Sequence, residues 1–327
     1  MDLDLAAALD DHVGDDLLRL IFMACHPALG RDTRVALTLR LFGGLSTPET
    51  ARALLLPEPT VAQRIVRAKR VLSTETFESP SPADLADRLA QVLEVVYLIF
   101  NEGYSATAGD DWTRPALCDE AMRLGRVLAG LAPAEPEVHG LAALMEIQAS
   151  RLRSRVGPLG APVLLADQDR RTWDRLLIRR GLAALTEAER LAGGTAALGP
   201  YGLQAAIAAC HARAGTACET DWPRIAALYR LLGLVSPSPV VELNRAVAVS
   251  MADGPGAGLS IVDGLEAERV LLGYPMLPAV RGDMLARLGR HDEARHEFEQ
   301  AADLTRNEAE RSVFLRRAAE LRDRPAS

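Results

Sequence analysis

Apolar residues in the first quarter of the chain recur every three to four positions, which is the spacing of helices that bury one face. This pattern is interrupted by proline and glycine, which end helices, at Pro27, Gly30, Gly43 and Pro57. The pattern therefore predicts four short helices, over about 15–26, 31–42, 46–56 and 59–72.

The third of these predicted helices begins with a helix-capping signal. Ser46 and Glu49 have the spacing of a capping box, and Pro48 stands in the first turn, where its missing N–H costs nothing. The short third helix, the tight turn around Pro57 and the longer fourth helix together have the arrangement of a helix-turn-helix.

From residue 84 onward the sequence predicts helices alone, separated by clusters of glycine and proline. The best candidate for a strand is Pro162–Leu165, which is short and has little alternation. The predicted helices cover 84–100, 114–131, 136–155, 169–192, 200–214, 222–235, 239–251, 256–264, 276–288, 291–304 and 308–323.

The C-terminal helix pairs have the periodicity of tetratricopeptide (TPR) repeats. In the last pair, small, large and aromatic residues stand where a TPR needs them for close packing of its two helices. Two earlier units match less closely, so an ordinary helical bundle with chance periodicity is the alternative. The matching positions are Gly282, Leu285, Ala294, Phe298 and Ala301.

Composition supports an all-α protein. The chain has 327 residues, of which 49% are hydrophobic but only 4% aromatic, and strands favour aromatic and β-branched residues. We expect a helix-turn-helix domain followed by an α-helical, TPR-like solenoid. The predicted units are an acidic linker tail (1–14), the helix-turn-helix domain (15–74), a linker (75–83), a central helical domain (84–198) and TPR-like repeats (199–327).

The fourth predicted helix has a local charge opposite to that of the whole chain. The formal net charge is −7, yet residues 60–72 contain four basic residues and no acidic one. On a helical wheel, Val61, Ile65, Ala68 and Leu72 share one face and are expected to be buried. This pattern favours a DNA-recognition helix; a basic face exposed to solvent is the alternative.

The polar residues of this helix suit the reading of a major groove. Gln pairs with adenine edges and Arg with guanine edges, and further basic residues contact phosphates. We expect Thr60, Gln63, Arg64 and Arg67 to lie on one face, with the first residues of the helix nearest the bases. The candidate DNA-binding residues are Thr60, Gln63, Arg64, Arg67, Lys69 and Arg70.

Nothing in the sequence predicts a catalytic site, a bound metal or a cofactor. Cys210, His211 and Cys218 are close in sequence but lack a standard metal-ligand spacing. The acidic N-terminus is unlike a signal peptide, and no apolar stretch is long enough to cross a membrane. We therefore expect a cytoplasmic protein that is not an enzyme.

Two polar motifs have structural interpretations. In the segment Asn101–Ser105, Gly103 is expected to end a helix and Tyr104 to pack back on it; the alternative is a ligand-binding or docking loop. Carboxylates and arginines surround Trp173 in the segment 167–174, where helix capping and a salt bridge between helices are favoured over acid–base catalysis.

Residues 15–74 resemble region 4 of extracytoplasmic-function (ECF) sigma factors. The run from Leu45 to Leu72 is similar to their scaffold and recognition helices, with Thr60, Val61, Arg64, Arg67 and Ala68 at matching positions. Four further segments resemble the ECF subgroup that carries a C-terminal TPR-like extension. These segments are Asn101–Ala106, Asp167–Asp174, Gly199–Ile207 and Leu243–Ala248.

The resemblance implies a function in transcription initiation. It implies that the helix-turn-helix recognises the −35 promoter element and contacts the flap of core RNA polymerase, while the extension modulates activity and offers a surface to a protein or ligand. Region 2 of such sigma factors is not found in this sequence, where residues 1–16 are expected to be the tail of an inter-domain linker. A stand-alone helix-turn-helix regulator and a TPR protein-binding adaptor are the alternative functions.

Overall fold

The computed structural model describes residues 23–26, 28–41, 45–54, 56–74, 82–105, 113–157, 163–265, 268, 271–305 and 307–322. These residues form helices and loops without a strand, which confirms the all-α prediction. The helices are α2 (Arg31–Leu41), α3 (Thr47–Ala53), α4 (Glu58–Thr74), α5 (Pro82–Tyr104), α6 (Pro115–Leu131), α7 (Pro136–Ala149), α8 (Arg175–Ala192), α9 (Pro200–Arg213), α10 (Trp222–Val235), α11 (Pro239–Asp253), α12 (Pro255–Asp263), α13 (Met276–Arg287), α14 (His291–Leu304) and α15 (Glu308–Arg322).

Most predicted helices end within a few residues of the observed ones, and the differences lie in the middle of the chain. The predicted helix over 136–155 stops at Ala149 and continues as a 3-10 turn, Leu152–Arg155. The one predicted over 169–192 starts later, because the Asp174 side chain accepts hydrogen bonds from the backbone of Leu176 and Leu177 and so caps α8. Most of the helix predicted over 15–26 lies outside the described residues.

The strand candidate Pro162–Leu165 is wrong within its described part. Leu164 is extended, but it leads directly into a 3-10 turn, Leu165–Asp167. The Val163 amide donates to the Arg155 carbonyl at 2.8 Å, and no strand lies beside this segment among the described residues. A short apolar run can therefore be extended without becoming part of a sheet.

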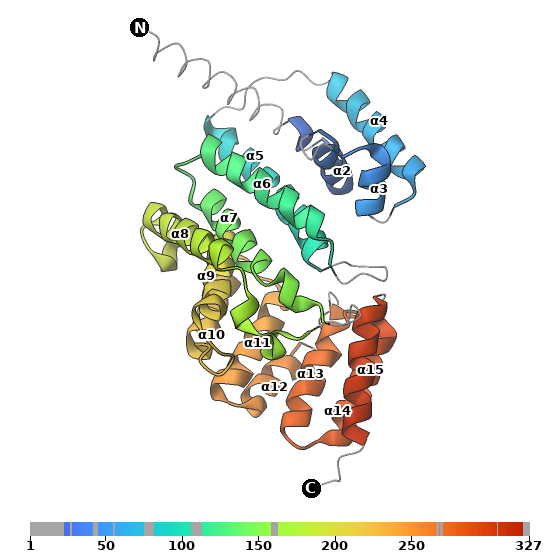
Figure 1. Ribbon diagram of the computed structural model, residues 1–327, viewed down its shortest axis with the longest axis vertical. Helices are drawn as coiled ribbons and strands as arrows, with labels where there is room; N and C mark the ends of the chain where they lie inside the picture. Colours follow the sequence, from blue (N-terminus) through green and yellow to red (C-terminus); the bar gives the residue numbers. More distant parts are fainter. Residues whose placement is uncertain are drawn as a thin grey trace.

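The helix-turn-helix lies at one end of the molecule. Figure 1 shows α2, α3 and α4 together beside α5 and α6, with α10–α15 at the opposite end. Two small cores hold this unit together: Ala24, Leu29, Leu37 and Ala68 form one, and Ala36, Ala51, Val61 and Ile65 form the other. Both cores include residues of α4, so α2 and α3 fix the orientation of the recognition helix.

The helix-turn-helix is also packed against the rest of the chain. Val35 and Leu39 of α2 belong to the same core as the buried residues of α5, α6 and α7. Beside this apolar contact, the Arg31 Nε lies 3.2 Å from a carboxylate oxygen of Glu94 on α5. The shared core connects α2 firmly to α5, whereas the exposed ion pair adds little energy.

Helix α7 is the central element of the fold. Ten of its fourteen residues are buried, and it packs closely against both α8 and α9. It contributes Leu141 and Met145 to the core shared with the helix-turn-helix, and Leu144 and Ile147 to the core of the helices that follow. An apolar surface on all sides is what a helix needs when it is surrounded by other helices.

Two glutamates of α7 make polar contacts that connect the helices around it. Glu137 accepts hydrogen bonds from the backbone amides of Tyr201 and Gly202, which caps the N-terminus of α9. Glu146 is buried and pairs with Arg126 of α6 and Arg180 of α8. Burial raises the pKa of Glu137, while its two backbone hydrogen bonds act in the opposite direction.

The helices from α10 to α15 pack mainly on their neighbours in sequence, as in a solenoid. In the last predicted repeat, Gly282 of α13 allows α14 to approach closely: a Cβ there would lie 3.2 Å from the Ala294 carbonyl and 3.3 Å from the Phe298 ring. Phe298 is fully buried between these helices. No described helix has the length and apolar character needed to cross a membrane.

The close approach of α7 and α9 leads to a stability prediction. A Cβ at Gly140 would lie 2.7 Å from the Gly202 amide nitrogen, so Gly140→Ala should push the helices apart and cost about 1–3 kcal/mol of unfolding free energy. Gly130 of α6 has open space around it, so Gly130→Ala should be neutral or stabilising by up to about 1 kcal/mol. Urea unfolding of both variants measures the difference, and equal stabilities would contradict this packing.

Candidate nucleic-acid interface

The two helices of the candidate interface are held by a compact turn. The Leu56 amide donates to the Ala51 carbonyl at 2.9 Å, and the Thr60 amide donates to the Pro57 carbonyl at 3.0 Å. Helix α3 starts beside Ser46, as the capping signal predicts, although the Glu49 side chain lies outside the described part of the structure. The turn satisfies its own backbone groups, so α4 begins in a defined direction.

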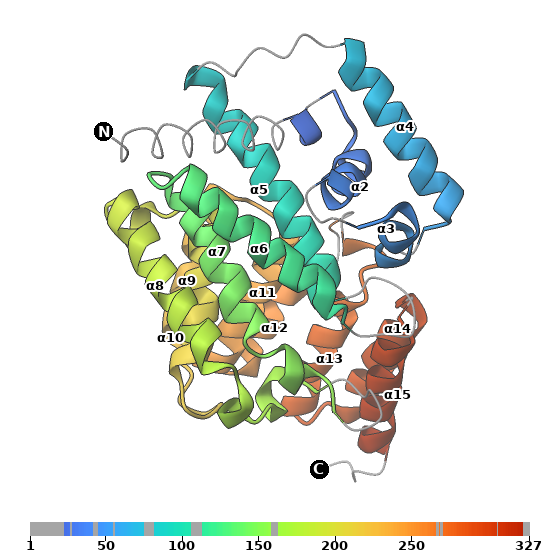
Figure 2. The ribbon, with the colours of Figure 1, turned by 45° about the horizontal axis from the view of Figure 1, so that its top comes forward.

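The buried face of α4 agrees with the wheel prediction. Val61, Ile65 and Ala68 are buried against α2 and α3, and Leu72 is partly buried beside them. The opposite face points away from the protein, along the outer edge of the molecule in Figure 2. Nothing in the described part of the chain covers that face, so it is accessible to a large partner.

The exposed face of α4 carries most of the predicted DNA-binding side chains. Gln63, Arg67, Lys69 and Arg70 are all exposed. Among these four, Gln63, Arg67 and Arg70 follow one another at spacings of three and four residues and therefore form a continuous stripe. A helix of this kind can place its polar side chains at base edges and phosphates together.

One residue of this face was missed by the sequence analysis. Val66 is 58% exposed and lies between Gln63 and Arg70 on the outward face. An exposed valine gains nothing from water, but in a major groove it can contact the methyl group of thymine. The available signal was its position, one turn after Gln63, on a surface that is otherwise polar.

Thr60 and Arg64 lie differently from the other candidates. Both are partly buried, and Arg64 reaches toward α2 instead of joining the outward stripe. The Arg64 Nη2 lies 3.1 Å from Oδ2 of Asp32, with the arginine side chain 28% exposed and the aspartate 69% exposed. The prediction that Arg64 lies on one face with Gln63 and Arg67 therefore needs a qualification, because its guanidinium is paired within the protein.

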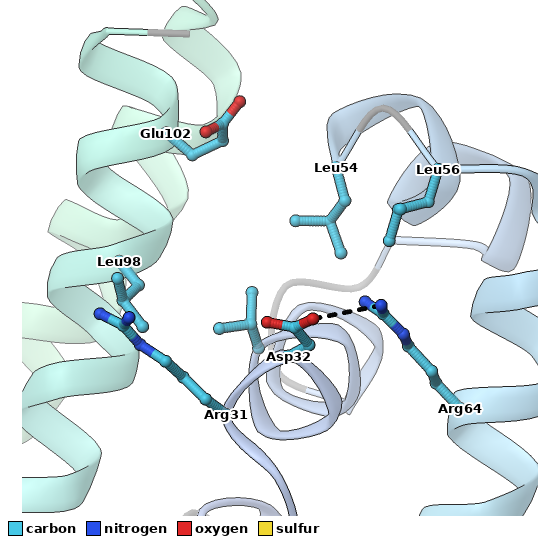
Figure 3. A pocket seen from close by; sticks show the side chains of 8 residues that line it. Arg31, Asp32, Leu54, Leu56, Arg64, Leu98 and Glu102 are labelled. Carbon is cyan, nitrogen blue, oxygen red and sulfur yellow. Dashed lines mark ion pairs between the residues drawn. The ribbon is translucent and has the colours of Figure 1, made fainter. Parts of the chain in front are cut away.

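Arg64 and Asp32 line a cavity between the helix-turn-helix and α5. Its volume is about 260 Å³, and Leu54, Leu56 and Leu98 form its apolar walls. In Figure 3 the Arg64 side chain reaches from α4 toward Asp32, while Leu98 and Glu102 project from α5 on the other side. The arginine is therefore held by a carboxylate at the junction of the two units.

An exposed pair such as this one contributes little energy. Exposed ion pairs in water are worth about 0–1 kcal/mol, so a phosphate or a guanine edge can compete with Asp32 for the arginine. Until the pair opens, the aspartate also places a negative charge beside the basic helix. Asp32 is thus a second residue that the sequence analysis did not identify, since it lies on a different helix, thirty-two residues before Arg64.

Cys210 and His211, which are adjacent in the sequence, make contacts within the fold. The Cys210 thiol donates to the Ala206 carbonyl at 3.4 Å, and the His211 ring lies edge-on to Trp222, with 5.2 Å between centroids. Burial, followed by the nearby Arg151 and Arg170, lowers the pKa of His211 to about 4. No grouping of three or more potential metal ligands occurs among the residues whose positions are described.

The two polar motifs are largely structural, with corrections to each. Gly103 does not end α5, which runs to Tyr104; it allows α6 to approach, since a Cβ would lie 2.8 Å from the Cys118 nitrogen. Tyr104 does pack back, stacked on Phe100 at 5.7 Å. In the second motif Asp174 caps a helix, but Asp169 pairs with Arg171 in its own loop and not between helices.

Comparisons with known proteins agree with this geometry. Residues 19–72 match the family model for Sigma-70, region 4, and residues 88–189 match a Family of unknown function (DUF6596). The chain is 47% identical over 327 residues to an uncharacterized protein of Rhizobium meliloti (strain 1021), covering 99% of this chain and 76% of that relative. This chain therefore belongs to the same family as the Rhizobium meliloti protein, and it is a sigma-factor-like protein whose helix-turn-helix is a sigma-70 region 4.

Proposed function

We propose that this protein is a sigma factor of the extracytoplasmic-function type, which directs core RNA polymerase to promoters by recognising the −35 element. The observation that carries this proposal is the exposed basic face of α4, within a segment that matches a family known to bind −35 DNA and polymerase. The rest of the chain carries a net negative charge, so we expect DNA to bind at α4 and not elsewhere on the protein.

In this proposal the side chains of α4 divide into two roles. Gln63 and Arg67 contact base edges with Val66 beside Gln63, and Arg64 joins them when it leaves Asp32. Lys69 and Arg70 lie farther along the helix and contact phosphates, while Thr60 sits at its start. Phosphate contacts set the position of the helix, and base contacts select the sequence.

The helices after α4 have a supporting role in the proposal. Helix α5 and the central domain (84–198) hold the helix-turn-helix (15–74) through the core that Val35 and Leu39 share with them. The TPR-like repeats (199–327) would modulate activity through a partner. A stand-alone regulator or a TPR adaptor remains the alternative, and co-purification with core RNA polymerase distinguishes them, because only a sigma factor requires that partner.

The two roles on α4 predict two kinds of variant. Gln63→Ala should reduce the preference for a selected duplex over a mismatched one by about 1–3 kcal/mol, because a base contact is lost. Lys69→Ala or Arg70→Ala should weaken binding to both duplexes alike and lower the salt slope by about 0.9, because one phosphate contact is lost. Fluorescence anisotropy at several salt concentrations, with a duplex enriched from a random pool, measures both quantities.

Equal effects of all these substitutions on both duplexes would contradict the assignment of base and phosphate contacts. If none of them changed DNA affinity, α4 would not be the DNA-binding element, and the adaptor function would be favoured. Circular dichroism of each variant checks that the exposed substitutions leave the helices intact.

The Arg64–Asp32 pair predicts a variant that gains affinity. Asp32→Asn should free the arginine and tighten DNA binding by about 0.5–1 kcal/mol, a factor of about two to five. Asp292→Asn is the matched control, because it changes net charge equally at an exposed pair on α14. If the two variants bind DNA with the same affinity, the effect is one of overall charge, and the pair does not restrain Arg64.

A further inference from the structure

Three of the segments that resemble the TPR-extended subgroup meet at one cavity in the centre of the molecule. They come from α5, α9 and α11, which are far apart in the sequence. The cavity has a volume of about 260 Å³ and lies away from the helix-turn-helix. The motif residues that line it are Asn101, Tyr104, Gln204, Ile207 and Asn244.

The lining of this central cavity is polar but carries no formal charge. No Asp, Glu, Lys or Arg lines it; the polar groups are side-chain amides, phenols and one serine hydroxyl. Amides offer both donors and acceptors, and phenol rings offer flat apolar faces as well. Buried apolar residues such as Phe100 and Leu144 form the rest of the wall. The nearest formal charges are positive, because Arg151 and Arg155 lie over the ring of Tyr104. A cationic ligand would therefore lose its hydration there without gaining a counter-ion.

Two polar groups of the cavity are held ready for a partner. Tyr104 is only 9% exposed, and its buried hydroxyl makes no hydrogen bond of normal geometry with the described residues, although Arg151 lies nearby. Gln148 accepts from Nε and Nη2 of Arg151 through its amide oxygen, which leaves its amide nitrogen as a donor. A buried hydroxyl without a partner is costly, so a ligand that bonds it is favoured.

We propose that this cavity binds a small molecule that has a flat ring, a hydrogen-bonding edge and no positive charge. Its volume is just below the range of roughly 300–1,000 Å³ that is typical of small-molecule sites, which limits the ligand to one or two rings. The ring lies against the apolar wall, because the Tyr104 ring already contacts Phe100 and Arg155, and its polar edge bonds the Tyr104 hydroxyl and the amides. The proposal does not depend on DNA binding by α4.

Helix α5 connects the cavity to the helix-turn-helix. Helix α5 presents Tyr97 and Asn101 to the cavity, and on a neighbouring face it presents Glu94 and Leu98 to the helix-turn-helix. A bound ring therefore contacts the same helix on which α2 is packed. Binding of the ligand in the cavity therefore stabilises α5, the helix on which the helix-turn-helix packs.

Binding of simple probes to the whole protein tests the proposal. Nicotinamide, benzamide and thymine are flat, uncharged and able to form hydrogen bonds, whereas benzamidine has the shape of benzamide with a positive charge. Saturation-transfer NMR should show saturable, millimolar binding of at least one uncharged probe and none of benzamidine. Tyr104→Phe or Asn244→Ala should weaken that binding about two- to tenfold, because one hydrogen bond is lost.

Gln300→Ala is the matched control, because it removes an exposed amide on α14, away from the cavity. It should leave the affinity for the probe unchanged. The proposal is overturned if no uncharged probe saturates, if benzamidine binds as well as benzamide, or if the cavity variants bind the probe as tightly as the Gln300→Ala protein. Thermal unfolding of each variant confirms that it is folded.

Discussion

The fold depends on the burial of α7 on all sides. Because this helix belongs to two cores at once, the helix-turn-helix side and the repeat side of the molecule are packed on a common element. Its close contact with α9 requires glycine at position 140, and its two acidic side chains cap α9 and join α6 with α8. Changes in α7 should therefore affect both sides of the molecule together.

The position of the recognition helix α4 depends on this packing. Helix α2 shares a core with α5 and α7, and the same helix packs on α4 through Leu37 and Ala36. The outward face of α4 is thus presented on a supported unit and not on a flexible arm. Its electrostatics are local: a basic stripe stands out from an acidic chain, and one of its arginines is restrained by Asp32. DNA can displace Asp32 from Arg64, because an ion pair that is largely exposed is weak.

The sequence was sufficient for the helices but not for their long-range contacts. Proline and glycine mark the helix ends at positions such as Pro200, Pro239 and Gly193, and these local signals do not depend on the rest of the fold. The periodicity of α4 also separated its buried residues from its exposed ones. The Arg64–Asp32 pair and the central cavity could not be predicted, because each joins residues that only the tertiary packing brings together. The residue type of Asp174 indicated a helix cap, but it did not show at which residue α8 begins.

Site-directed DNA cleavage shows whether the outward face of α4 lies against DNA. A chemical nuclease attached at Val66→Cys, in a protein whose exposed Cys218 is replaced by serine, would sit on the outward face of α4. The same reagent at Leu234→Cys, an exposed position on α10, is the control. On a selected duplex we expect cleavage confined to one stretch of about one helical turn from position 66, and none from position 234. Cleavage from both positions alike, or from neither while the DNA is bound, would contradict it.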